Sequence, residues 1–132
     1  MAFKMGPPPF WKKPRKRKKQ FEVIRKNLDD GIAGEANNDD TIFVDADIPE
    51  GSIEEKEVVA HEGQHMKDMK DGILDYGDDW IKWRGKKYER NNGMIKYKGA
   101  WLEEGYKDFP WEKRAYKAGD AAVKKIKKEK NG

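Results

Sequence analysis

Three short runs of apolar residues, rich in β-branched and aromatic side chains, fall between residues 20 and 48. Glycines bound the second run, and an Asn-Asn-Asp-Asp segment at residues 37–40 supplies a turn signal before the third. Such runs predict strands, and we expect a small, largely antiparallel sheet that leads directly into a helix. The predicted strands are residues 21–25, 31–36 and 41–48.

A helix is expected next, at Ile53–Lys70, because both of its ends carry strong signals. Ser52 followed by Glu55 forms a capping box, in which each residue satisfies a free backbone N–H at the start of a helix. Gly72, directly after Asp71, supplies a stop. The pattern therefore predicts a helix of defined length after the sheet.

The pattern after this helix is loop-like from residue 73 and becomes more regular near Trp80. Residues 86–90 and 94–98 then flank Asn91-Asn92-Gly93, which predicts a β-hairpin with a tight turn. Five aromatic residues in this region suggest either a base-stacking platform or core that covers the helix, and the small size of the domain favours core. They are Trp80, Trp83, Tyr88, Tyr97 and Trp101.

A second long helix is predicted to begin near residues 108–112, because Pro110 suits a first helical turn and acidic residues stand beside it. Its apolar and small residues recur at helical spacing, and a basic segment at residues 124–130 suits a solvated helix C-terminus. The spaced residues are Ala115, Tyr116, Gly119, Ala122, Val123 and Ile126. The predicted fold class is therefore α+β, with a short sheet, a helix, a hairpin and a C-terminal helix.

The first 19 residues differ in composition from the rest of the chain. They contain four of the six prolines and eight lysines and arginines with no acid, which predicts a basic, flexible arm ahead of a single domain at residues 20–132. Such an arm is a solubilising tail, a phosphate-contacting segment or a peptide that docks on a larger assembly. Phe3, Phe10 and Trp11 favour docking through residues 1–19.

Charge is segregated along the 132 residues, although the net charge is only +4. The arm carries +8, residues 20–112 carry −10, and residues 113–132 carry +6. An acidic body argues against a dedicated nucleic-acid domain and allows weak, non-specific contact through the basic ends. No apolar run predicts a membrane span or a secretory signal, so we expect the chain away from membranes.

The candidate chemistry lies in the middle of the first helix, at His61-Glu62-Gly63-Gln64-His65. These are the only two histidines of the chain, and on a helix their four-residue spacing places both imidazoles on one face, where they can bind one Zn²⁺. Glu62 stands beside them, where it can take a proton from a water that the metal activates. An exposed, charged helix with two idle histidines is the alternative.

A catalytic zinc site needs a third protein ligand, and the chain has no cysteine and no third histidine. We predict Glu112, in the first turn of the second helix, because small Ala115 lets the two helices approach closely. An acid that merely favours the helix dipole is the ordinary interpretation of this residue. The other carboxylates that remain open as ligands are Asp68, Asp75, Glu104 and Asp108.

Tyr116 lies one turn after Glu112 on the same helix face, and we predict it as a catalytic residue that donates a hydrogen bond to the oxyanion formed when water attacks a carbonyl. Packing in the core is an equal alternative. Tyr76 and Tyr106 are rivals for the same role.

His-Glu-Gly-Gln-His at residues 61–65, together with Pro-Trp-Glu-Lys-Arg-Ala-Tyr at residues 110–116, resembles the gluzincin metallopeptidases, above all their minimal single-domain members. The resemblance covers about residues 21–125. It implies a zincin-like domain that hydrolyses peptide or protein substrates, with zinc held by His61, His65 and Glu112 and with Glu62 as the general base. It further implies an edge strand above the cleft that pairs with extended substrate, at residues 31–36 or 41–48.

The opening Met-Ala-Phe-Lys-Met-Gly-Pro-Pro is similar to the N-terminal arms of some proteins of tailed bacteriophages. That resemblance implies a phage-encoded protein that lies in the cytoplasm of a host cell or on the virion and that docks on the phage particle. It also supports a second hypothesis, an accessory virion protein that keeps the fold with a vestigial or structural zinc site.

Overall fold

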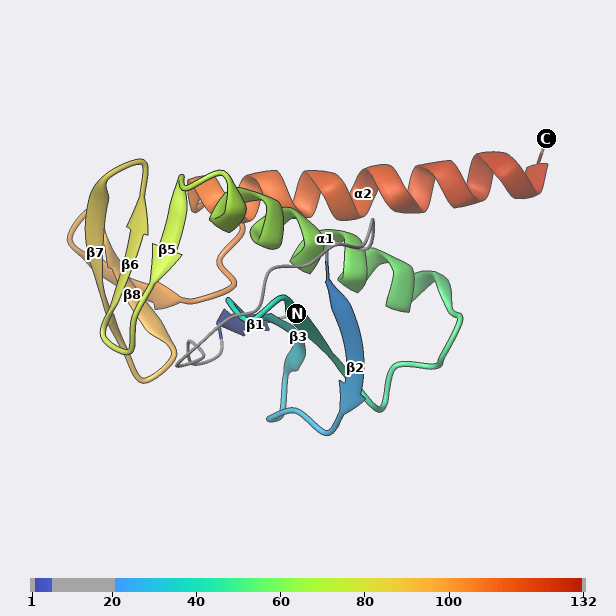
Figure 1. Cartoon of the computed structure of the whole chain (residues 1–132), viewed down its shortest axis with the longest axis horizontal. Coiled ribbons are helices and arrows are strands. Elements are labelled where there is room, and N and C mark those ends of the chain that lie inside the picture. Colours follow the sequence, from blue (N-terminus) through green and yellow to red (C-terminus); the bar gives the residue numbers. More distant parts are fainter. Residues whose placement is uncertain (1, 6–20, 132) are drawn as a thin grey trace.

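Two β-sheets and two long helices make up the described chain, residues 2–5 and 21–131, in the computed structural model (Figure 1). The helices, α1 and α2, lie side by side. One sheet covers α1 on the side away from α2, and the second sheet stands at the end of the helix pair where α2 begins (Figure 1). The predicted α+β class is confirmed.

Helix α1 spans Ile53–Lys70, as its end signals predict. The Ser52 Oγ accepts a hydrogen bond from the Glu55 backbone N–H at 3.1 Å, which satisfies one free donor of the first turn. Asp71 caps the other end, and Gly72 follows in the left-handed conformation at φ +81°. Local sequence therefore determines the limits of the helix that carries both histidines.

The first sheet is mixed, and the prediction of a largely antiparallel sheet is wrong. Its strand order is β1-β3-β4-β2, in which only β3 and β4 are antiparallel. The connection from β2 to β3 passes the end of β4, where the Leu28 N–H donates to Asp45 Oδ1 at 3.1 Å, so β2 and β3 lie on opposite sides of β4. The strands are β1 (Ala2–Met5), β2 (Glu22–Lys26), β3 (Ile32–Ala36) and β4 (Thr41–Asp45).

Strand β1 lies within the segment predicted as a flexible arm. It pairs in parallel with β3, with Phe3 level with Gly34 and Met5 level with Ala36. The sequence pattern does not predict this strand, because its partner is about 30 residues away and the prolines that follow argue for an extended tail. The remainder of the arm, residues 1 and 6–19, lies outside the described residues.

The second sheet is an antiparallel meander of five strands, β5 to β9. It contains the predicted hairpin, which is β7 and β8, and extends it on both sides. Three two-residue turns build it, each with a left-handed residue followed by a left-handed glycine: Arg84-Gly85, Asn92-Gly93 and Lys98-Gly99. The strands are β5 (Leu74–Tyr76), β6 (Trp80–Trp83), β7 (Lys86–Asn91), β8 (Met94–Tyr97) and β9 (Ala100–Glu103).

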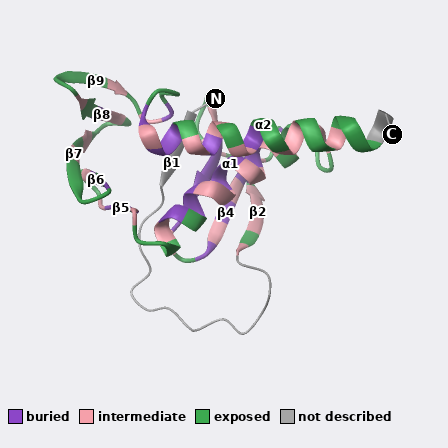
Figure 2. Cartoon of the chain, turned by 90° about the horizontal axis from the view of Figure 1, so that it is seen from above, coloured by how far each residue is buried: buried purple, intermediate pink, exposed green. Residues whose placement is uncertain are grey.

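Each sheet has its own hydrophobic core. The first core lies between α1 and the first sheet, with Val58 of α1 fully buried, and Figure 2 shows most buried positions where these elements meet. The second lies between the meander and the start of α2, and it contains Trp83, with Tyr88 and Tyr97 packed against it. These three predicted core aromatics are confirmed, whereas Trp101 is 43% exposed.

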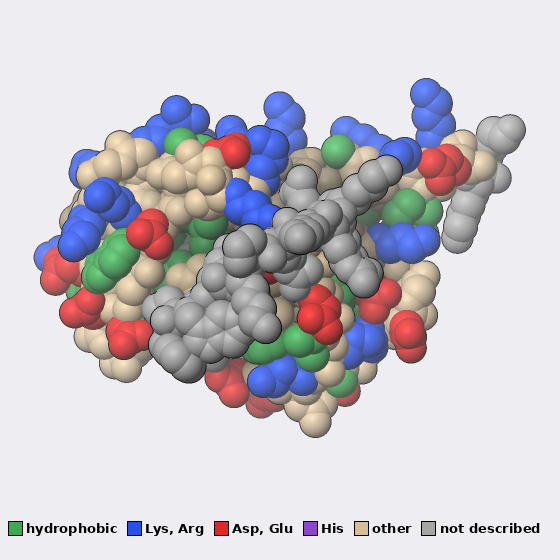
Figure 3. Space-filling view, in the orientation of Figure 1, with side chains coloured by type: hydrophobic (Ala, Val, Ile, Leu, Met, Phe, Trp, Pro, Cys, Tyr) green, Lys and Arg blue, Asp and Glu red, His purple; other side chains and the backbone are tan. Residues whose placement is uncertain are grey.

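Helix α2 spans Pro110–Asn131 and begins at the predicted proline. Ala115 is fully buried, and a Cβ added at Gly119 would lie 3.2 Å from the backbone oxygen of Glu57 on α1. Small residues thus bring the two helices close together. The later turns of α2 extend past α1 into solvent (Figures 1 and 2), and Lys and Arg side chains line this edge of the molecule (Figure 3).

Candidate metal centre

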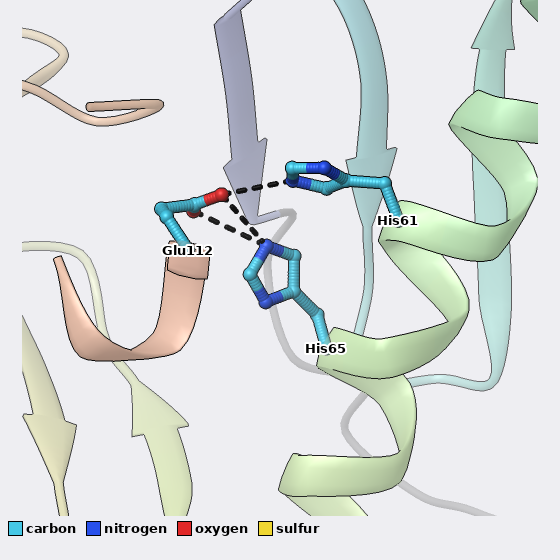
Figure 4. A group of neighbouring side chains, drawn as sticks. All are labelled: His61, His65 and Glu112. Carbon is cyan, nitrogen blue, oxygen red and sulfur yellow. Dashed lines mark hydrogen bonds and ion pairs between the residues drawn. The ribbon is translucent and has the colours of Figure 1, made fainter. Parts of the chain in front are cut away.

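Three buried side chains meet where α1 passes the first turn of α2 (Figure 4). The His61 Nε2 lies 2.8 Å from Glu112 Oε1, and the His65 Nε2 lies 3.2 Å from the same oxygen and 3.1 Å from Oε2. One ligand atom from each residue lies within 4.8 Å of those of the other two. The three predicted ligands are therefore brought together in a group that can hold a metal ion.

The geometry of this group follows from the two helices. His61 and His65 are one turn apart, so both rings project from the same face of α1 toward α2 (Figure 4), with ring centroids 5.1 Å apart. Pro110 sets the start of α2, which places Glu112 in its first turn, and the small residues of α2 allow the close approach. Residues 51 positions apart in the chain thus share one site.

Burial and mutual contact set the charge state of the ligands. Burial lowers the pKa of His61 below its ordinary value, which favours the neutral imidazole that a metal requires. Burial acts to raise the pKa of Glu112, but the charge and hydrogen bonds of His65 and His61 outweigh it, so the pKa of Glu112 lies below its ordinary value. At His61 and Glu112 these shifts favour the neutral imidazole and the ionised carboxylate that a metal binds.

Glu62 lies next to this group and has no solvent exposure. Neither of its carboxylate oxygens has a hydrogen-bond partner within the described part of the chain. Burial, with the nearby charges of Glu112 and Glu35, raises the pKa of Glu62 well above its ordinary value. A buried carboxylate without a hydrogen-bond partner among the described residues is costly, so Glu62 does not stabilise the fold where it lies.

Strand β3 crosses α1 at the level of Glu62. A Cβ added at Gly34 would lie 2.7 Å from Val58 Cγ1 and 3.0 Å from Glu62 Oε2, so only glycine fits here without a shift. The backbone of β3 therefore runs directly over the buried carboxylate. The sequence prediction includes residues 31–36 as an edge strand and does not single out Gly34.

Tyr116 packs against the site through its ring. The ring lies edge-on to His61, with centroids 4.5 Å apart, and its hydroxyl donates to the Gly105 backbone oxygen at 2.9 Å. Burial, with the charges of Glu112 and Glu62, raises the pKa of Tyr116 to about 12. These contacts fit the alternative in which Tyr116 packs in the core. Its role as a hydrogen-bond donor to an oxyanion stays a prediction.

The competing residues have other partners. Asp68 is fully buried and accepts two hydrogen bonds from Arg114, at 2.9 and 3.0 Å, and one from Gln64. Glu104 pairs with Arg90, Asp108 accepts from the Tyr106 hydroxyl, Asp75 is exposed, and the Tyr76 hydroxyl accepts from the Asn38 N–H. Of the candidate third ligands, only Glu112 contacts the histidines among the described residues.

No known protein-family model, curated protein or solved structure matches the chain.

Among the described residues, no helix has the length and apolar character to cross a membrane.

Proposed function

We propose that this chain is a zinc-dependent peptide hydrolase of the gluzincin type. One observation supports this function most directly: two histidine nitrogens and a carboxylate meet in a buried space beside a second carboxylate that has no hydrogen-bond partner among the described residues. Structural ion pairs do not need the second carboxylate, whereas hydrolysis of a peptide bond needs a base.

His61, His65 and Glu112 would hold the metal. Two imidazoles and one carboxylate are a donor set typical of catalytic zinc, which leaves one position open. Ligand atoms on one tetrahedral zinc lie roughly 3.3 Å apart, so a group within 4.8 Å requires only small movements of its side chains. Bound zinc supplies a Lewis acid that polarises a carbonyl and makes a water more acidic.

Glu62 would act as the general base. Its oxygens are free of hydrogen bonds within the described residues, so they can take a proton from the attacking water and return it to the leaving amine. Its raised pKa makes ionised Glu62 a stronger base than an ordinary carboxylate, which favours the first of these proton transfers.

The test compares three variants of the purified protein in zinc content and in cleavage of a peptide library. Glu62→Gln should retain zinc and lose cleavage by about 10²-fold or more, the size typical of a general base. His61→Ala should lose both zinc and cleavage. Glu54→Gln is the matched control, because Glu54 lies on the same helix with its side chain exposed, and it should change neither.

Full cleavage by Glu62→Gln would remove Glu62 as the base. Stoichiometric zinc with no cleavage by the parent chain would instead favour a structural site, as in the accessory virion hypothesis. The same set of proteins therefore distinguishes a hydrolase from a structural zinc site.

A further inference from the structure

Strand β1 occupies the edge of β3 that lies over the candidate metal centre. Ala2–Met5 pair with Ile32–Ala36, with an irregularity between Ala2 and Phe3. β4 occupies the other edge of β3. In Figure 4, β1 and β3 pass behind the three ligands. Both edges of β3 are thus taken within the described chain.

The pairing reaches the level of the site itself. Phe3 is level with Gly34, and the position of a Cβ at Gly34 is 3.0 Å from Glu62 Oε2. An extended peptide that adds to β3 as a strand, with its backbone alongside Glu62, would need the position that β1 holds. The residues from Ala33 to Ala36 are all buried in this arrangement, so little of the β3 edge is left open.

We propose that Ala2–Met5 are an intramolecular occupant of the substrate-binding edge, and that the chain inhibits itself until this strand is displaced or removed. This inference rests on the proposed hydrolase function. A strand on the same chain has a high effective concentration, so a free peptide must compete against it. The strand is nevertheless short and irregular at one end, which makes exchange feasible.

The ligand that would replace β1 is therefore a separate, extended peptide that binds β3 through its backbone. Main-chain hydrogen bonds give such a site its affinity, so many sequences fit if they can donate those bonds. Proline cannot donate them. This difference provides a control peptide of the same length in which prolines replace the two central donors.

The test compares the full chain with a variant that lacks residues 2–5, both loaded with zinc. Binding of the peptide Met-Ala-Phe-Lys-Met, which is the sequence of residues 1–5, is measured by calorimetry beside the control Met-Ala-Pro-Pro-Met. If the edge is free in the full chain for a tenth of the time or less, the deletion should raise affinity and cleavage of a peptide library by at least about ten-fold. The proline peptide should bind neither protein.

If the deletion variant does not fold, two single proline substitutions in the full chain test the same proposal. Successive residues of a strand turn their N–H groups to opposite sides, so of Phe3→Pro and Lys4→Pro only one removes a bond to β3. That variant should bind the peptide about ten-fold more tightly, and its neighbour should behave like the parent. Equal peptide binding by all of these proteins would overturn the proposal.

The outcomes separate this proposal from the proposed function. Cleavage by the full chain at the rate of the deletion variant would remove self-inhibition and leave the hydrolase. If the zinc-loaded deletion variant binds the peptide, the full chain does not, and neither protein cleaves peptides, the claim that β1 occupies a peptide-binding edge would stand. The proposed hydrolase function would then be wrong.

Discussion

Glu62 is a buried carboxyl that is costly to ionise in the folded protein. It is fully buried, and its pKa lies well above the ordinary 4.5 because burial and the charges of Glu112 and Glu35 oppose ionisation. A raised pKa means that the carboxyl favours folding when it is protonated. That contribution is complete below the ordinary pKa and is lost as the pH rises through the raised pKa.

Glu62→Gln cannot ionise, so in metal-free protein it should lack this loss. Denaturant unfolding in the presence of a chelator, from pH 4 to pH 7.5, measures the effect. The difference in unfolding free energy should move in favour of the variant as the pH rises, by on the order of 1–3 kcal/mol. Parallel curves for parent and variant would show that the carboxyl ionises in the fold without penalty.

Substitution of Gly34 should also change the free energy of unfolding, in this case for a steric reason. Gly34→Ala adds a Cβ 2.7 Å from Val58 Cγ1, and valine is too stiff to move away easily, so we expect a loss of about 1–3 kcal/mol in unfolding free energy. Gly63→Ala is the control, because its Cβ would meet Phe21 at an ordinary 3.5 Å. In a helix interior that change should stabilise by up to about 1 kcal/mol. Equal effects at both glycines would contradict the close approach of β3 to Glu62.

At the scale of elements, the helices were predictable and the strand pairings were not. Ser52, Gly72 and Pro110 act on their immediate neighbours, so local sequence predicts where α1 starts and ends and where α2 starts. The pairing of β1 with β3 and the parallel pairing of β2 with β4 join segments that are not neighbours in the chain. No local pattern encodes such a register, so the sheet was predicted with the wrong strand directions.

Turn chemistry explains why only one hairpin of the meander was predicted. Asn92-Gly93 is a strong turn signal, whereas Arg84 and Lys98 adopt the left-handed conformation although their side chains do not favour it. In both cases the following glycine makes the turn feasible. At β9 the apolar residues are consecutive, Ala100-Trp101-Leu102, so they do not show the alternation that predicts a half-buried strand.

The Lys98-Gly99 turn provides a test of this explanation. Gly99 has φ +83°, so Gly99→Ala should lower the unfolding free energy by about 1–2 kcal/mol. Lys98→Asn should be neutral or slightly stabilising, since asparagine accepts φ near +51° readily. Thermal unfolding of the two variants beside the parent measures both changes, and destabilisation by Lys98→Asn alone would contradict the turn.

At the scale of the whole molecule, the site depends on the packing of α1 against α2. Elimination predicts a carboxylate as the third ligand, because the chain has no cysteine and no third histidine, and the small residues that allow a close helix pair favour Glu112 among the candidates. It could not predict that Asp68 would be taken by Arg114 or that the Tyr116 hydroxyl would reach Gly105, because these partners are set by the tertiary arrangement. The grouping of His61, His65 and Glu112 was therefore predictable, whereas the contacts around them were not.

Metal content of the purified protein, beside a Glu112→Gln variant, tests the central claim most directly. Glu103→Gln is a matched control, because Glu103 is exposed on β9. We predict one zinc ion for each parent and control chain, and at least about ten-fold weaker zinc binding by Glu112→Gln, which keeps the shape of the side chain and removes its charge. A parent chain without metal, or a Glu112→Gln variant that binds zinc as tightly as the parent, would contradict a metal centre built from His61, His65 and Glu112.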